Sequence, residues 1–372
     1  MTKIKTIKSI GSYSAEDAIF LLKDISDVIK ESSTEEREQA IQSGTHYSEM
    51  LPIEYKPSQS YMDLFFASLE QNKRRLAIIT GVVAEQIIKK RGENLVLVSL
   101  ARAGTPIGIL IKRYILYQYN LDLPHYCISI IRGRGIDENA LHYIMQQHPN
   151  QEIQFIDGWS GKGAITKELQ QTIHEFNEKN HVCISDCIAV LADPGYCTSI
   201  YGTREDFLIP SACLNATVSG LVSRTVLNGA YIGPKDFHGV KYYKELEKED
   251  LSNFFIEEVT ALFSSTSSDI KKQLEHVIST YTEPSWQGLQ DIASIQKHFE
   301  IENINLIKPG IGETTRVLLR RVPWKILIRE KNNPDLIHSL HLAKEKNIPV
   351  EIYKDMTYSC CGLIKPLERK PS

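Results

Sequence analysis

The chain has 372 residues, which exceeds a typical single domain and predicts at least two. Its composition, 42% hydrophobic and 24% charged, is that of an ordinary globular protein, and 46 acids against 43 bases leave a net charge of −3. This balance excludes a global attraction to nucleic acid or anionic lipid, so any such binding has to be local.

Apolar runs and cysteine spacing indicate the compartment in which the protein is expected to work. No apolar run is long enough for a signal peptide or a membrane span, so we expect a cytoplasmic protein with no membrane partner. The seven cysteines form no CxxC pair and are odd in number, which favours reduced, mostly buried thiols over a disulfide or zinc framework. We therefore expect no metal held by protein ligands.

The first 60 residues are expected to form an arm packed on the core. Polar and aromatic residues alternate over 42–49, which suits either a segment covering a substrate or a plain surface segment. A helix is expected over 61–90, with a break near Gly81.

A parallel sheet is first indicated by the apolar run 94–100, NLVLVSL, which has the length of a strand buried on both faces. The next residues form a short loop: Ala101, Arg102, Ala103 and Gly104. Ligands of such sheets lie at the carboxyl ends of the strands, where the forked guanidinium of Arg102 would match phosphate oxygens. A simple strand-to-helix turn, with Thr105 as helix cap and Pro106 at the first helical position, also explains the loop and is compatible with phosphate binding.

The next expected strand, 126–131, runs into a basic and glycine-rich turn. Arg132 and Arg134 alternate with two glycines there, a pattern that suits a mobile lid closing over a phosphate ester. A solvated turn without a ligand is the alternative.

A strand over 153–156 leads into Asp157 and a turn of small residues before a helix that begins near Ala164. The expected ligand-binding residues of this turn are Asp157, Gly158, Ser160, Gly161, Lys162 and Gly163. Glycines at 161 and 163 allow successive N–H groups to converge on an anion at the helix N-terminus, and a carboxylate suits sugar hydroxyls. The turn therefore predicts a phosphorylated ribose as ligand, although it matches neither the Walker A nor the GxGxxG pattern.

Two later segments carry further candidates. After the strand 187–193, we expect a wall that receives an acceptor molecule, formed by Asp193, Asp206 and Asn215. Beyond a helical connector over 263–302, a new α/β unit over 303–372 concentrates bases in an otherwise acidic chain. These predict an RNA-binding surface, for which the candidates are Lys308, Gly310, Gly312, Arg316, Arg320 and Arg321.

Several segments in order resemble the tellurite-resistance-associated phosphoribosyltransferase-like family, also called StiP-like. They include VSLARAGTPIGIL, SIIRGRGIDENAL, FIDGWSGKGAI and LIPSACLNATVSGLVSR, while KPGIGETTRVLLRR and YSCCGLIKP resemble a Pelota-type RNA-binding domain. The resemblance implies a type I phosphoribosyltransferase-like fold, a mainly parallel sheet flanked by helices over 61–262, and a small L7Ae/Pelota-like α/β domain over 303–372.

The activity that this resemblance implies is phosphoribosyl transfer in a tellurite-resistance or stress-associated route to a nucleoside-like metabolite. Phosphoribosyl pyrophosphate would react with an unknown acceptor, with Mg²⁺ carried by the substrate, Asp157 and Arg102 as catalytic residues, and Ala101 to Gly104 on the pyrophosphate. RNA would bind the C-terminal domain, and a homodimer is left open.

There are two alternatives to phosphoribosyl transfer. Some members of the family carry a cysteine protease label, and here the nucleophile would be Cys213 or Cys197 with His238 or His46 as base. The other alternative is a nucleotide or RNA sensor that has the fold but no catalytic activity.

Overall fold

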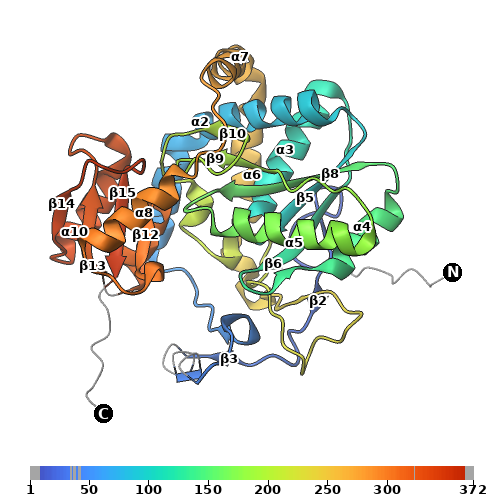
Figure 1. Ribbon diagram of the computed structural model, residues 1–372, viewed down its shortest axis with the longest axis horizontal. Coiled ribbons are helices and arrows are strands. Elements are labelled where there is room, and N and C mark those ends of the chain that lie inside the picture. Colours follow the sequence, from blue (N-terminus) through green and yellow to red (C-terminus); the bar gives the residue numbers. More distant parts are fainter. Residues whose placement is uncertain (1–8, 34–35, 37–38, 41–42, 322, 365–372) are drawn as a thin grey trace.

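The apolar runs of the sequence form one central sheet in the computed structural model (Figure 1), which describes residues 9–364 apart from 34–35, 37–38, 41–42 and 322. The strands lie in the order β1, β6, β5, β8, β9, β10 and are parallel, while β7 pairs antiparallel with β6. Their bounds are β1 Ile19–Phe20, β5 Leu95–Ala101, β6 His125–Ile131, β7 Gly135–Ile136, β8 Glu152–Trp159, β9 Ile188–Ala192 and β10 Ile200–Thr203. The prediction of an α/β fold with a mainly parallel sheet is confirmed.

The direction of winding reverses at β5. This strand pairs with β6 on one side and β8 on the other, so that Leu97 lies opposite both His125 and Gln154. In doubly wound sheets the loops beyond such a point diverge to opposite faces and leave a crevice at the carboxyl ends of the strands. The loops that follow Ala101 and Trp159 therefore flank this crevice.

Helices cover both faces of the sheet (Figure 1). On one face α2, α3, α6 and α7 pack against one another and against β5, β8, β9 and β10. On the other face α5 packs on β6 and β7, and α4 lies beside it through a contact between the His142 and Phe176 rings. The bounds are α2 Gln59–Arg91, α3 Gly104–Tyr119, α4 Glu138–Gln147, α5 Ala164–Asn180, α6 Ser252–Thr260 and α7 Phe263–Ser279.

The predicted break in the first long helix is wrong. Helix α2 runs without interruption through Gly81. A Cβ atom at this position would lie 2.5 Å from Ile270 of α7 and 2.9 Å from Tyr114 of α3. Gly81 therefore lets three helices approach closely, rather than ending one.

The C-terminal residues form a second unit around a mixed sheet. Its strand order is β12, β15, β13, β14, with β15 antiparallel to both neighbours and β13 parallel to β14. The elements are α8 Gln287–His298, β12 Ile307–Pro309, α9 Ile311–Arg320, β13 Pro323–Ile328, α10 Ile337–Glu345, β14 Val350–Ile352 and β15 Cys360–Ile364. A separate cluster of buried apolar side chains, among them Ile295, Ile307 and Leu363, gives this unit its own core.

The remaining elements are short, and one pairing among them, β2 with β11, joins the N-terminal arm to the central unit. Strand β2 (Lys23–Asp24) pairs with β11 (Gly239–Val240), and β3 (Glu31–Ser32) pairs with β4 (Leu51–Pro52). Short 3₁₀ helices are η1 Tyr47–Glu49, η2 Pro210–Ala212, η3 Ala216–Val218, η4 Lys244–Glu249, η5 Ile304–Leu306 and η6 Pro334–Leu336.

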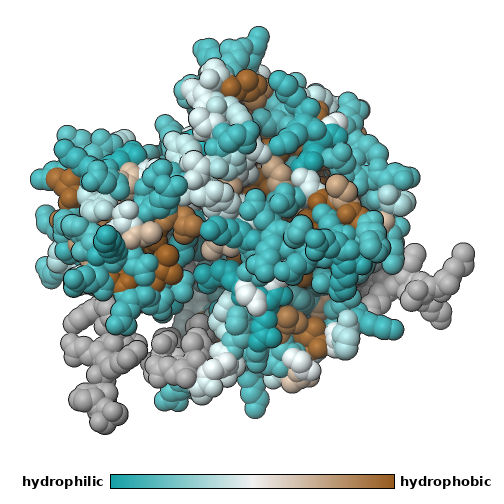
Figure 2. Space-filling model, viewed as in Figure 1, coloured by the Kyte–Doolittle hydropathy of each residue, from teal (hydrophilic) through white to brown (hydrophobic). Residues whose placement is uncertain are grey.

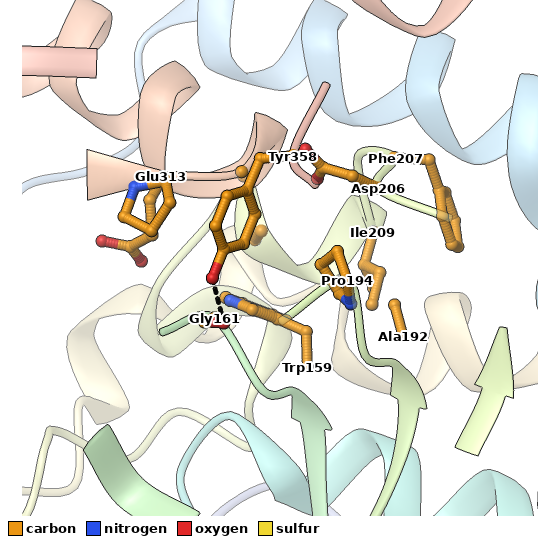
Figure 3. A pocket seen from close by; sticks show the side chains of 13 residues that line it. Trp159, Gly161, Ala192, Pro194, Asp206, Phe207, Ile209, Glu313 and Tyr358 are labelled. Atoms are coloured by element: carbon orange, nitrogen blue, oxygen red, sulfur yellow. Dashed lines mark hydrogen bonds between the residues drawn. The ribbon is translucent and has the colours of Figure 1, made fainter. Parts of the chain in front are cut away.

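The two units are joined by buried hydrogen bonds. The Asp206 carboxylate accepts from the backbone N–H groups of Ile311 and Ser359, at 2.9 and 2.8 Å. The Tyr358 hydroxyl donates to the Gly161 carbonyl at 2.9 Å (Figure 3). The void that remains between these residues measures about 20 Å³, room for roughly one water molecule.

The face shown in Figure 2 is mostly hydrophilic, and its hydrophobic side chains form small separate groups. None of the helices within the described ranges has the length and hydropathy needed to cross a bilayer.

Candidate functional site

The loop after β8 has the backbone conformation that the sequence predicts. Gly161 and Gly163 both have positive φ angles, 52° and 78°, and Gly163 immediately precedes α5. Asp157 accepts a hydrogen bond from the N–H of Gly158 at 2.8 Å. Burial raises the pKa of Asp157 to about 7, although the Arg316 charge opposes this shift.

This loop lines a cleft of about 370 Å³ between the central sheet and the C-terminal domain. Trp159 and Ser160 share the cleft wall with Ala103 of the preceding loop. The charged side chains that line it come from both domains and are Arg132, Asp157, Lys162, Lys308, Glu313 and Arg316.

Arg102, the other predicted catalytic residue, does not join Asp157. Its guanidinium donates to the Val222 carbonyl at 3.1 Å and lies 3.9 Å from the Glu54 carboxylate. It lines a second, larger cavity of about 550 Å³. Of the predicted pyrophosphate loop, Ala101 ends β5, Gly104 begins α3, and Ala103 alone lines the cleft.

The predicted lid is a short turn between β6 and β7. The N–H groups of Gly133 and Gly135 donate to the Glu168 carboxylate of α5 at 2.8 and 2.9 Å. Arg134 pairs with Glu49 of the arm at 2.8 Å, while Arg132 lines the cleft. The arginines are therefore near the expected site, and their role as a lid stays a prediction.

The three residues predicted to receive an acceptor are separated in the structure. Asp193 is fully buried, forms an ion pair with Arg204 and accepts hydrogen bonds from the backbone of its own loop. Asp206 caps the N-terminus of α9, as described above, and burial raises its pKa to about 6. Asn215 lines the larger cavity with Arg102.

The predicted RNA-binding residues do not share one open surface. Lys308 and Arg316 line the cleft, and Arg316 donates to the Ala212 carbonyl at 3.2 Å and to Glu313 at 3.1 Å. Arg321 is exposed and lines the larger cavity. Gly310 precedes α9 with a φ angle of 88°, and Gly312 lies against Ala212, whereas the Arg320 side chain lies outside what the structure describes.

The cysteines differ sharply in their surroundings. Cys213 is buried at the end of η2, yet it lines the 550 Å³ cavity together with Glu54, Arg102 and Arg224. Burial raises the pKa of Cys197 to about 12, which keeps its thiol protonated at neutral pH. All seven cysteines lie within the described ranges, and all are free thiols.

The two predicted histidine bases do not line the cavity of Cys213. His238 is buried, its ring Nδ1 lies 2.8 Å from the Ser129 hydroxyl, and burial lowers its pKa. His46 Nδ1 lies 2.8 Å from the Ser48 hydroxyl in the arm. The Glu54 carboxylate lines the cavity of Cys213 and accepts from the N–H of Ala216, in the loop after the thiol, at 3.5 Å.

Sequence reasoning missed Glu54, Arg224 and Trp159 as site residues. Glu54 and Arg224 lie about 170 residues apart and meet only through folding, so the sequence holds no local signal for their pairing with Cys213. Trp159 lies inside the predicted ligand-binding turn, and an aromatic residue at that position could have been recognised from the sequence as a contact for a ligand. Within the described residues no group of three or more His, Cys, Asp or Glu side chains is arranged to hold a metal ion.

Fold and cavities define an α/β protein with a second, mixed-sheet domain docked at the carboxyl ends of its central strands. The chain matches the family model described as "Tellurite-like stress resistance cysteine protease StiP" over residues 11–260, and the model of the "PELOTA RNA binding domain" over 286–366. It is 34% identical over 373 residues to the cysteine protease StiP of Acinetobacter baylyi, covering 96% of this chain and 94% of that protein. The chain therefore belongs to the StiP family and carries a Pelota-type domain at its C-terminus.

One solved structure, a hypoxanthine-guanine-xanthine phosphoribosyltransferase, is 11% identical and covers 48% of this chain and 93% of its own. Its TM-score is 0.22, which is too low to support a common fold.

The predicted phosphoribosyltransferase activity is wrong. The family and the curated relative are both named for a cysteine protease, so they favour the hydrolase alternative over a pentosyl transferase that uses phosphoribosyl pyrophosphate. The structure agrees with this correction. Arg102 and Asp157 line different cavities, whereas a single ribosyl donor would need both residues in one site. The substrate-bound Mg²⁺, which was tied to that donor, and the homodimer stay predictions.

Proposed function

We propose that this protein is a cysteine protease with the Cys213 thiol as its nucleophile. The support from comparison is membership of the StiP family and the name of the relative from Acinetobacter baylyi. The observation that carries the assignment to Cys213 is its position on the wall of the 550 Å³ cavity, among basic side chains. Cys197, the other candidate, has a strongly raised pKa and is a poor nucleophile.

Positive charge around Cys213 is the basis of its activation. Arg102, Arg224 and Arg321 line the same cavity, and nearby guanidinium groups stabilise a thiolate relative to the thiol. The same charges favour peptides that carry carboxylates next to the scissile bond. We therefore expect a preference for acidic peptides or for cleavage near a C-terminus.

Glu54 takes the place of a histidine in proton transfer. Its carboxylate accepts the thiol proton, the sulfur attacks the peptide carbonyl carbon, and the proton passes to the leaving amine as the C–N bond breaks. The Asn215 side-chain amide is the hydrogen-bond donor for the oxyanion of the tetrahedral intermediate. Water then hydrolyses the thioester and restores the thiol.

A peptide library incubated with the full chain tests this proposal. Mass spectrometry should detect cleavage products, Cys213→Ser should reduce their rate of formation by at least about 10²-fold, and Glu54→Gln by about 10-fold or more. Cys197→Ser is the matched control and should cleave at close to the parent rate. If only the Cys197 variant lost cleavage, Cys197 would be the nucleophile and the assignment to Cys213 would be refuted.

We further infer that the central sheet has the topology of a type I phosphoribosyltransferase-like fold without that activity. The support is the strand order, in which four parallel strands, β6, β5, β8 and β9, reverse at β5, and the loops at their carboxyl ends. An experimental structure whose strands followed a different order would refute this inference.

RNA binding is the second function that we propose, for the C-terminal domain. The supporting observation is the match of residues 286–366 to the PELOTA RNA binding domain. Gel shifts of the full chain with hairpin and single-stranded RNA at low salt test it, and no shift with any RNA would refute it.

A further inference from the structure

The cleft between the two domains gathers four basic side chains around a cavity of about 370 Å³. Arg132 and Lys162 come from the central domain, and Lys308 and Arg316 come from the C-terminal domain. Two carboxylates, Asp157 and Glu313, share the cleft, and Glu313 forms an ion pair with Arg316. Among the residues that the structure describes, neither lysine forms an ion pair, so four basic side chains against two carboxylates leave an excess of positive charge.

The lysines of the cleft repel each other and the neighbouring arginine. Burial lowers the pKa of Lys162 to about 8, and the charges of Lys308 and Arg132 lower it further in the same direction. Burial and the Arg132 charge likewise lower the pKa of Lys308, although the Glu313 carboxylate opposes this shift. Clustered basic side chains lower the free energy of unfolding of the free protein, and an anionic ligand between them would relieve the repulsion.

An aromatic ring completes the cleft. Trp159 lies at the end of β8, is partly exposed and lines the cavity, and the Arg316 guanidinium is 5.5 Å from its ring. A partly exposed aromatic ring beside positive charges is an arrangement with which proteins bind single-stranded nucleic acid, because nucleobases stack on the ring while phosphates contact the cations. A ligand with alternating phosphates and bases matches both features.

We propose that single-stranded RNA enters this cleft, with its phosphates on Lys162 and Lys308 and a base stacked on Trp159. The proposal rests on RNA binding by the C-terminal domain and goes beyond it, since half of the RNA site lies on the central domain. Two basic side chains of the Pelota-type domain, Lys308 and Arg316, line this cleft. An RNA bound by that domain would therefore pass between the two domains.

Fluorescence anisotropy with a labelled single-stranded 10-mer RNA and the full chain tests the proposal. Lys162→Gln should weaken binding by about 5-fold or more at low salt and reduce the slope of log affinity against log salt by about 1. Trp159→Ala should weaken binding by about 5-fold or more and leave that slope unchanged. Trp159→Phe retains an aromatic ring and should bind nearly as well as the parent chain.

Lys89→Gln is the matched control. Lys89 is an exposed lysine in the last turn of α2, which leads to the amino end of β5, the edge of the sheet opposite the cleft. Its substitution should leave affinity unchanged. Parent-like binding by the Lys162 and Trp159 variants, with loss only in Lys308→Gln, would confine RNA to the C-terminal domain and overturn the proposal. Displacement of the RNA by uridine monophosphate at equal concentration would also overturn it, in favour of a mononucleotide site.

Discussion

At the scale of single residues, the half-buried Asp157 and the buried Asp206 hold protons more tightly than ordinary aspartates. Asp157 in the cleft has a pKa of about 7, and Asp206 between the domains has one of about 6. Unfolded aspartate titrates near pH 4, at roughly 3.9. As pH rises from about 4, the unfolded chain releases protons that the folded chain retains, so stability falls up to about pH 6 through Asp206 and up to about pH 7 through Asp157.

Asp157→Asn should remove one of these contributions. We expect the stability of the variant, relative to the parent chain, to increase as pH rises from about 4 to about 7 and to stay level above about 8. Urea denaturation at pH 5, 6, 7 and 8 measures this difference, and Asp206 contributes equally to both proteins. A difference that did not change with pH would show that burial does not raise the pKa of Asp157.

At the scale of elements, helix packing and domain docking depend on single small or charged groups. Gly81 allows α2 to contact α3 and α7, and Asp206 joins the central domain to α9 and to the segment before β15. In each case one residue supports a contact between elements that lie far apart in the sequence.

Gly81→Ala should destabilise the protein, although alanine normally favours a helix interior by about 1 kcal/mol. The added Cβ would lie 2.5 Å from Ile270, so the helices would have to separate, at a cost of about 1–3 kcal/mol. Gly229→Ala is the control, because nothing lies within 4 Å of a Cβ there. Thermal denaturation measures both, and a rise in the melting temperature of Gly81→Ala would contradict the packing argument.

Asp206→Ala should loosen the docking of the C-terminal domain. Two buried N–H groups would lose a carboxylate acceptor, which we expect to cost about 1–3 kcal/mol in urea denaturation. Glu205→Ala, at the neighbouring exposed position, removes only a surface ion pair with Arg75 and should cost less than about 1 kcal/mol. Equal losses in the two variants would mean that Asp206 contributes no more than a surface charge.

At the scale of the whole molecule, the sequence predicted the central sheet because its strands are continuous apolar runs, as in 94–100. The sequence did not predict that Gly81 allows close helix packing, because the contact that requires glycine comes from Ile270, far along the chain. The turn of Gly161 and Gly163 was predictable from local geometry, whereas the direction of the Arg102 side chain was not. That direction depends on Val222 and Glu54, which only folding brings near.

The same reason explains the error about function. Loops at the carboxyl ends of two neighbouring strands were expected to form one site, but the structure divides their side chains between the cleft and the larger cavity. The spacing of Arg316 and Arg320 predicts that they share one face of a helix, but it does not predict which part of the protein that face contacts. In the folded chain Arg316 meets Ala212, the residue before Cys213. Contacts between domains are thus the part of the site that no local pattern contains.

The central claim, that Cys213 is the nucleophile of a protease, is tested most directly by trapping its acyl intermediate. An acidic peptide that the full chain cleaves is mixed with the enzyme, the reaction is quenched in acid, and mass spectrometry locates the adduct. We predict a thioester on Cys213, with no adduct in Cys213→Ala and an undiminished one in Cys197→Ser. An adduct on another residue, or peptide cleavage that persists in Cys213→Ala, would contradict this account.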